Sequence, residues 1–113
     1  MGASVSGPAQ GSSFSFEATA DGARTLVALE GEIDAYTSPR LTQGFAGLGD
    51  VAGRHVVVDL GEVGFVDSAG LSALVASLQA VREDGGAVSL RSVSRQLTKL
   101  FEITGLSRMF SIE

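Results

Sequence analysis

One serine carries most of the chemistry that this sequence offers. Ser68 lies in the run Phe65–Leu71 (FVDSAGL), a short way after the apolar run His55–Leu60. The apolar run predicts a buried strand that leads into a short turn, and the residues from Gly70 onward predict an amphipathic helix. A hydroxyl at the first residues of a helix lies beside free backbone N–H groups and the positive end of the helix dipole, a place that can hold a phosphate. Ser68 is therefore a candidate switch residue in a protein that works by binding.

A simpler interpretation makes the same residues plain helix caps. Serine is a common N-cap residue, and Asp67 is equally suited to capping. Asp34, in the loop after an earlier strand, is likewise a common turn residue. Both loops are expected to follow a strand and to precede a helix. If the two strands are parallel neighbours, both loops lie at the edge of the sheet where α/β folds usually place their sites, and this convergence favours a function.

Nucleophilic catalysis by Ser68 has little support. A nucleophile elbow has the pattern G-x-S-x-G, and although Gly70 fits the last glycine, Val66 stands where the first is required. His55 is the only histidine, and it lies at the entry to the predicted strand. Because a strand rises about 3.3 Å per residue, His55 is out of hydrogen-bond reach of the serine. We therefore predict no catalytic residues and interpret His55 as a partly solvated strand residue.

Metal ions and cofactors have no support either. The chain has one histidine and no cysteine, and its carboxylates do not show the spacing of metal ligands. Gly47, Gly49 and Gly53 do not follow a strand and lack the lysine of a phosphate-binding loop, so they are interpreted as loop glycines. We predict neither a metal site nor a bound cofactor.

Composition and charge limit the class of protein. The 113 residues suit one domain, and a net charge of −5 opposes binding to nucleic-acid phosphates while suiting a basic or mixed protein partner. No apolar run is long enough to span a bilayer, and no secretory signal precedes the domain. Together with the absence of cysteine, this predicts a cytoplasmic protein with no membrane partner. Residues 1–13 are expected to form a flexible tail, and residues 14–113 the domain.

The periodicity of the sequence predicts an α/β fold in the order β-β-α-β-α-β-α, with a further strand or turn at 110–112. Strands are expected over residues 14–18, 25–30, 55–60 and 87–91, the third of them covered on both faces. The first two form an antiparallel hairpin and the others pair in parallel through right-handed crossovers, which gives a mixed β-sheet with about three to four helices packed on it.

Three helices follow from capping signals and apolar stripes. The first begins with Ser38 as N-cap and Pro39 behind it and ends at Gly49, the second ends at the glycine pair 85–86, and the third runs from a Ser94 cap to Gly105. Their core-facing residues are predicted to be Leu41, Phe45 and Leu48, then Leu71, Leu74, Val75, Leu78 and Val81, and finally Leu97, Leu100 and Phe101.

These motifs resemble the STAS domain family, and specifically the anti-sigma factor antagonists of bacteria. The resemblance covers most of the chain, from about residue 29 to residue 110. It is carried by G-E-I-D at 31–34, V-V-D-L at 57–60 and D-S-x-G-L at 67–71, and then by the glycine pair and the run L-F-x-I-T-G-L at 100–106. The spacing of the G-E-I-D and D-S-x-G-L motifs is specific to this family.

The resemblance implies a partner-switching cycle. Proteins of this class bind an anti-sigma factor that is also a GHKL-type serine kinase, and binding frees a sigma factor for transcription. The kinase phosphorylates the serine that follows the aspartate, here Ser68, and a PP2C-type phosphatase reverses the reaction. Asp34 and Asp67 would line the partner-binding edge together with Ala69, and Gly70 would permit the tight entry to the helix. Many relatives carry a second hydroxyl where this chain has Ala69, so Ser68 is the only hydroxyl in the turn.

Two other functions remain open from the sequence. One is a phosphorylatable scaffold subunit of a large, stressosome-like sensory complex in the bacterial stress response, and the other is a STAS module that binds a small ligand. The expected oligomeric state is a monomer or a weak dimer, since the edge strand that begins at Phe14 is available for pairing.

Overall fold

A computed structural model describes residues 13–113, so the predicted tail over residues 1–13 lies outside the described part except for Ser13. The sheet has five strands in the order β1-β2-β3-β4-β5. β1 and β2 are antiparallel, and every later neighbour pairs in parallel. The strands are β1 (Phe14–Asp21), β2 (Arg24–Ile33), β3 (His55–Val66), β4 (Ala87–Arg91) and β5 (Ser111–Ile112). The mixed sheet with an opening hairpin is confirmed, and the last predicted segment is a strand.

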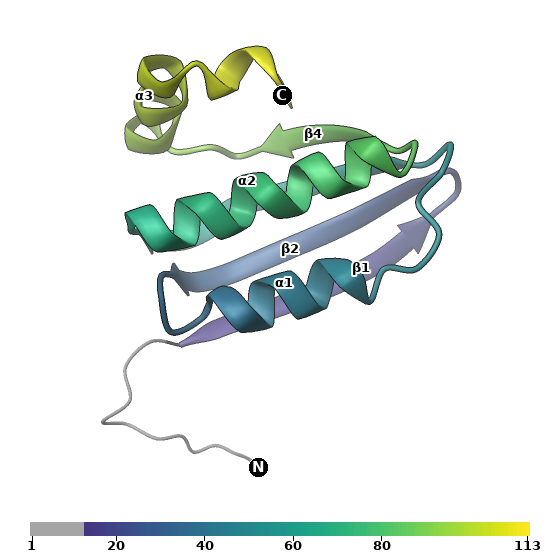
Figure 1. The fold of residues 1–113 in the computed structure, drawn as a ribbon, viewed down its shortest axis with the longest axis horizontal. Coiled ribbons are helices and arrows are strands. Elements are labelled where there is room, and N and C mark those ends of the chain that lie inside the picture. Colours follow the sequence, from purple (N-terminus) through teal and green to yellow (C-terminus); the bar gives the residue numbers. More distant parts are fainter. Residues whose placement is uncertain (1–12) are drawn as a thin grey trace.

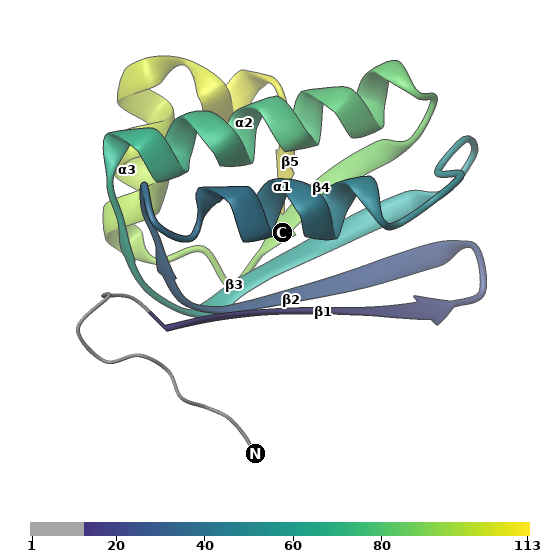
Figure 2. The same ribbon diagram turned by 60° about the horizontal axis from the view of Figure 1, so that its bottom comes forward.

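Three α-helices and one 3-10 turn complete residues 13–113. They are α1 (Ser38–Ala46), α2 (Ser68–Glu83), α3 (Arg95–Thr104) and the 3-10 turn η2 (Leu106–Arg108). α1 and α2 lie side by side on one face of the sheet, and α3 lies beyond α2 at one end (Figure 1, Figure 2). The core consists of the side chains packed between this helical layer and the sheet.

The prediction that β3 is covered on both faces was wrong. The two helices that flank β3 in the chain, α1 and α2, lie on the same side of the sheet, and no helix in the described part of the chain covers the other side (Figure 2). The reason is the strand order: the sheet grows in one direction, and successive right-handed crossovers then place their helices on the same face. His55 and Asp59 accordingly remain partly exposed, while Val57 is buried among neighbouring strands.

The predicted core is largely confirmed. The predicted residues that are at least nine-tenths buried are Leu41, Phe45, Leu74, Leu78, Val81, Leu97 and Phe101. Four others are only partly buried at the margin of the core, namely Leu48, Leu71, Val75 and Leu100.

α1 begins and ends earlier than its sequence signals indicated. Its N-cap is Thr37 rather than Ser38, and the helix ends at Ala46 with Gly47 as C-cap rather than at Gly49. The buried Thr37 hydroxyl donates to the Glu32 carbonyl at 2.8 Å, which fixes the start of the helix against the end of β2. The early end has a local cause, since glycine is a poor helix former and three glycines occupy positions 44, 47 and 49.

β3 is twice as long as the strand predicted over residues 55–60. We expected a turn after Leu60, but the strand continues to Val66 and pairs with the end of β2. Two irregularities in the pairing, between Ala28 and Glu30 and between Gly31 and Glu32, leave β3 with two extra residues relative to β2. Bulges of this kind bend a strand and re-aim its side chains, and here they lie just before the β3–α2 turn.

The first turn of α2 lies directly against the end of β2. Gly70 is buried, and a β-carbon added there would lie 2.0 Å from the Ile33 carbonyl oxygen and 2.8 Å from the backbone nitrogen of Asp34. Real side chains do not approach backbone atoms this closely, so only glycine permits the contact. The two motifs that are far apart in the sequence, at 31–34 and 67–71, therefore touch through their backbones.

We expect Gly70→Ala to lower the free energy of unfolding by about 3 kcal/mol or more, because overpacking usually costs about 1–3 kcal/mol and a backbone carbonyl cannot rotate away as a side chain does. The gain in helix propensity, about 1 kcal/mol, is too small to offset this cost. Denaturant unfolding followed by circular dichroism measures the change.

Gly64→Ala is the matched control, since Gly64 lies in β3 with no atom within 4 Å of an added β-carbon. This control should leave stability unchanged or raise it slightly. Equal midpoints for the two variants would contradict the close approach of α2 to β2.

Candidate functional site

The β3–α2 turn is organised by the carboxylate of Asp67. Asp67 is the N-cap of α2, and its Oδ1 accepts the N–H of Gly70 at 2.7 Å. Its Oδ2 lies 3.4 Å from the N–H of Ala35, and its own N–H donates to the Ile33 carbonyl at 3.1 Å. One residue thus joins the helix start to the end of β2 and to the loop that follows it. Of the two candidate caps in the sequence, Asp67 performs the capping.

The β2–α1 loop is organised in the same way by Asp34. Its carboxylate Oδ1 accepts the N–H groups of Tyr36 at 2.9 Å and Thr37 at 3.0 Å. The N–H of Asp34 donates to the Thr37 hydroxyl at 2.9 Å, and its carbonyl accepts the Ser38 hydroxyl at 2.6 Å. Asp34 is only 7% exposed, so its side chain faces the inside of the loop. The structure gives it a part in holding the loop shape.

Ser68 and Ala69 are exposed at the junction that these two aspartates hold. Ser68 is the first residue of α2, and its hydroxyl makes no hydrogen bond within residues 13–113. The first helical hydrogen bond runs from Leu71 to the Asp67 carbonyl, and the cap takes the Gly70 N–H. The N–H groups of Ser68 and Ala69 therefore remain outside the helical ladder, at the positive end of the helix dipole. The site combines an exposed nucleophilic hydroxyl with donors suited to an oxyanion.

The five site residues predicted from the sequence come together at one place. Because β2 and β3 are parallel neighbours, Asp34 and Asp67 follow adjacent strands at the same edge of the sheet. Ser68 and Ala69 are at the surface, Asp67 is partly buried, and Asp34 and Gly70 are buried beneath. The condition under which the sequence favoured a function, that the two strands pair in parallel, is met.

Sequence reasoning missed two exposed aromatic side chains at this edge. Tyr36 in the β2–α1 loop is 74% exposed, and Phe65 near the end of β3 is 53% exposed. Tyrosine and phenylalanine at a surface are typical of protein contacts, because they bury a large area at low cost in conformational entropy. The alternating pattern of a strand indicates on which face of the sheet Phe65 lies, but it does not indicate whether another element covers that face. The signal in the sequence was weak for this reason.

The residues considered for nucleophilic catalysis, His55 and Ser68, lie at opposite ends of β3. His55 begins β3 and Ser68 follows its end, and the His55 ring contacts the Ser89 hydroxyl at 2.5 Å. Residues 13–113 contain no group of three or more His, Cys, Asp or Glu side chains able to hold a metal ion. None of the helices in that range has both the length and the apolar character needed to cross a bilayer.

Known proteins resemble this chain in sequence and in fold. Residues 16–111 match the family described as "Mlab, STAS domain". The anti-sigma-B factor antagonist of Bacillus subtilis is 35% identical over 86 residues, which are 76% of this chain and 78% of that protein. The anti-sigma-B factor antagonist of Listeria monocytogenes is 37% identical over 83 residues, which are 74% of this chain and 73% of that protein.

A solved structure agrees with these sequence matches. The crystal structure of an anti-sigma factor antagonist from Mycobacterium paratuberculosis has a TM-score of 0.72 and 28% identity, and the match covers 88% of this chain and 85% of that one. The family match includes both the β2 end and the start of α2, where the candidate site lies. The chain belongs to the STAS-domain anti-sigma factor antagonist family of bacteria.

Proposed function

We propose that this chain is an anti-sigma factor antagonist whose binding is switched off by phosphorylation of Ser68. The observation that carries the proposal is the exposed hydroxyl of Ser68 on the first residue of α2, at an edge held by Asp67 and Gly70. The names of the Bacillus and Listeria relatives support the class of partner. In this cycle the unphosphorylated form binds a cytoplasmic anti-sigma factor and frees a sigma factor.

The partner surface has a contacting layer and a supporting layer. Ser68 and Ala69 are exposed and contact the partner directly, and Asp67 beside them is partly exposed. Asp34 and Gly70 are buried, and they serve the interface by fixing the loop and the helix start on which the contacting residues stand. In the proposed cycle the anti-sigma factor is also the kinase that phosphorylates Ser68, of the GHKL type, and a PP2C-type phosphatase restores the free serine.

Phosphorylation acts through charge at a fixed position. A phosphate adds about −1.5 to −2 charges at neutral pH and three strong acceptor oxygens. Within the free protein, the N–H groups of Ser68 and Ala69 and the helix dipole accommodate this charge. A partner packed against Asp67 meets it in a desolvated contact, where like charges cost several kcal/mol. A cost of about 3–4 kcal/mol weakens binding by roughly a hundred- to a thousandfold.

Baits that mimic the two states of Ser68 test the switch. In a pull-down from lysate of the native organism, Ser68→Ala should retain a GHKL-type kinase that mass spectrometry identifies, and Ser68→Asp should lose it. Ser72→Asp is the matched control, since Ser72 is exposed one turn further along α2 and adds the same charge. This control should retain the kinase. Equal recovery of partners by the two Ser68 baits would contradict the proposal and leave Ser68 as an ordinary helix residue.

The charge of Asp67 can be separated from its capping role. Asp67→Asn keeps an oxygen that accepts the Gly70 N–H and loses only the long contact with the Ala35 N–H, so it should cost less stability than Asp67→Ala, which should cost about 1 kcal/mol. If the carboxylate contacts the partner, Asp67→Asn should weaken binding of the captured kinase about tenfold in calorimetry, whereas the protein stays folded. Unchanged affinity for the asparagine variant would restrict Asp67 to its structural role.

The switch should operate without refolding. Asp67 caps the helix by accepting the Gly70 N–H, a hydrogen bond that does not involve Ser68, and Gly70 leaves no room for α2 to move closer to β2. Amide chemical shifts of phosphorylated and free protein should therefore differ only around residues 34–37 and 66–72. Large shift changes across β4, β5 and α3 would instead indicate a conformational mechanism.

A further inference from the structure

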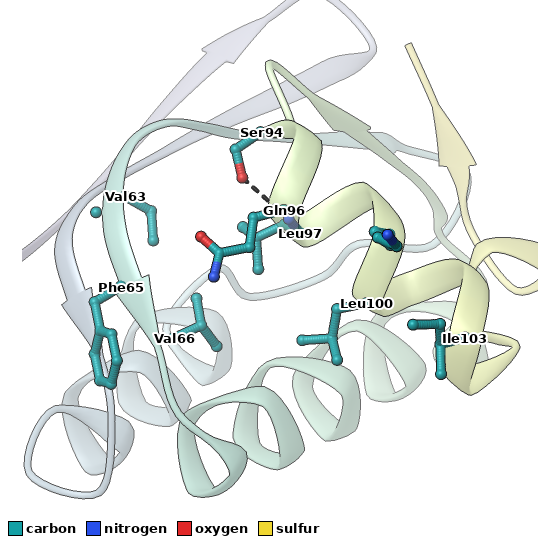
Figure 3. A pocket seen from close by; sticks show the side chains of 10 residues that line it. Val63, Phe65, Val66, Ser94, Gln96, Leu97, Leu100 and Ile103 are labelled. Carbon is teal, nitrogen blue, oxygen red and sulfur yellow. Dashed lines mark hydrogen bonds between the residues drawn. The ribbon is translucent and has the colours of Figure 1, made fainter.

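An apolar groove of about 300 Å³ lies between the end of β3 and α3 (Figure 3). Val63, Phe65 and Val66 line it from the β3 side, and Leu97, Leu100 and Ile103 line it from α3. Val66 directly precedes Asp67, the cap of α2. The groove is therefore continuous along the chain with the turn that carries the phosphorylatable serine.

The apolar side chains at the mouth of this groove, Phe65 and Ile103, lie outside the core. α3 buries Leu97 and Phe101 in the core, and Leu100 packs against its margin. Ile103 lies on a different face and is 74% exposed, and Phe65 on the opposite wall is 53% exposed. Large apolar side chains that are exposed together around a groove mark an interaction site more often than they serve stability.

The chemistry of the groove fits a protein segment better than a small ligand. Its volume is at the lower limit of ligand pockets, about 300–1,000 Å³, and such pockets hold a few convergent polar groups. Here the Ser94 hydroxyl is used as the cap of α3, where it accepts the Leu97 N–H at 3.1 Å. Gln96 and Lys99 are exposed, and Lys99 is the only charged residue among those that line the groove. An apolar floor with one cation at its margin is complementary to an amphipathic helix that carries an acidic residue.

We propose that this groove is the second half of the interface with the kinase. An amphipathic helix of the kinase lays its apolar face between Phe65 and Ile103 and places an acidic side chain against Lys99. The inference rests on the proposed function, since it concerns the same partner. Docking here holds the kinase on the antagonist while its active site reaches Ser68, so the groove contributes to binding in both the complex and the phosphorylation reaction.

Ile103→Glu tests this surface with little risk to the fold, because the replaced side chain is mostly exposed. With the kinase captured by the Ser68→Ala bait, Ile103→Glu should raise the KM for phosphorylation of Ser68 at least tenfold and leave kcat unchanged, since only docking is lost. Ala76→Glu, at an exposed position in the middle of α2, is the matched control and should keep the KM of the parent chain. An unchanged KM for Ile103→Glu would overturn the groove as a docking site.

Charge reversal at Lys99 provides a second, independent variant. Lys99→Glu should weaken kinase binding about tenfold. Lys99→Arg should keep the affinity within about twofold of the parent chain, because it retains the positive charge. Equal affinities for Lys99→Glu and Lys99→Arg would overturn the acidic docking helix.

The lysate pull-down separates this inference from the proposed function. Loss of the kinase from a Ser68→Ala bait that also carries Ile103→Glu supports the groove. Full recovery on the double variant overturns the groove and leaves the switch at Ser68 intact. Recovery of no kinase by either bait overturns the proposed function, and the groove proposal with it.

Discussion

The backbone of Gly70 lies against the carbonyl group of Ile33, and no side chain fits between the two. This contact brings the start of α2 to the end of β2, two segments separated by the whole of α1 and β3. Asp67 then uses both carboxylate oxygens, one on the helix and one toward the loop after β2. The position of Ser68 follows from these constraints, because Ser68 and Ala69 lie between a fixed cap and a fixed glycine and have little conformational freedom.

Buried polar groups hold an exposed one in place at this edge. Asp34 and Thr37 are buried, and their side chains hydrogen-bond to the backbone of their own loop and of the end of β2. Burial of polar groups is costly unless every group finds a partner, so the loop has one well-satisfied shape. Ser68 needs no such partner because it faces solvent. A rigid base with a free hydroxyl suits a switch that acts by added charge, since a flexible base would move the phosphate away from a partner.

The groove between β3 and α3 extends the edge that carries Ser68 toward α3. Its walls come from a strand and a helix that the rest of the fold already fixes, so the surface is preformed. The two irregularities in the β2–β3 pairing lie in the same part of β3 as the groove wall, where Phe65 is exposed. The proposed interface, with a charge-sensitive part at Ser68 and an apolar part at the groove, separates regulation from affinity. In this proposal apolar contacts supply binding energy, while the phosphate decides whether the contact forms.

Local patterns in the sequence were sufficient for the order of the elements and for the motif residues. The period of the apolar residues identified each helix and the hairpin, and the run at 67–71 contained a cap, a serine and a glycine in their working order. These features depend on interactions within a few residues, which a pattern records directly. The predicted parallel pairing of two strands placed the loops at 31–34 and 67–71 at one edge of the sheet, and the family resemblance added the expectation that this edge binds a partner.

Only the tertiary structure decided the features that depend on distant partners. β3 continues past Leu60 because it pairs with the end of β2. The alternation of apolar and polar residues in one strand does not reveal which strand pairs with it. The open face of the sheet, the Thr37 cap of α1 and the exposure of Phe65 and Ile103 have the same origin. A pattern indicates which face a side chain occupies, but burial depends on what packs against that face. That information lies in the contacts between elements.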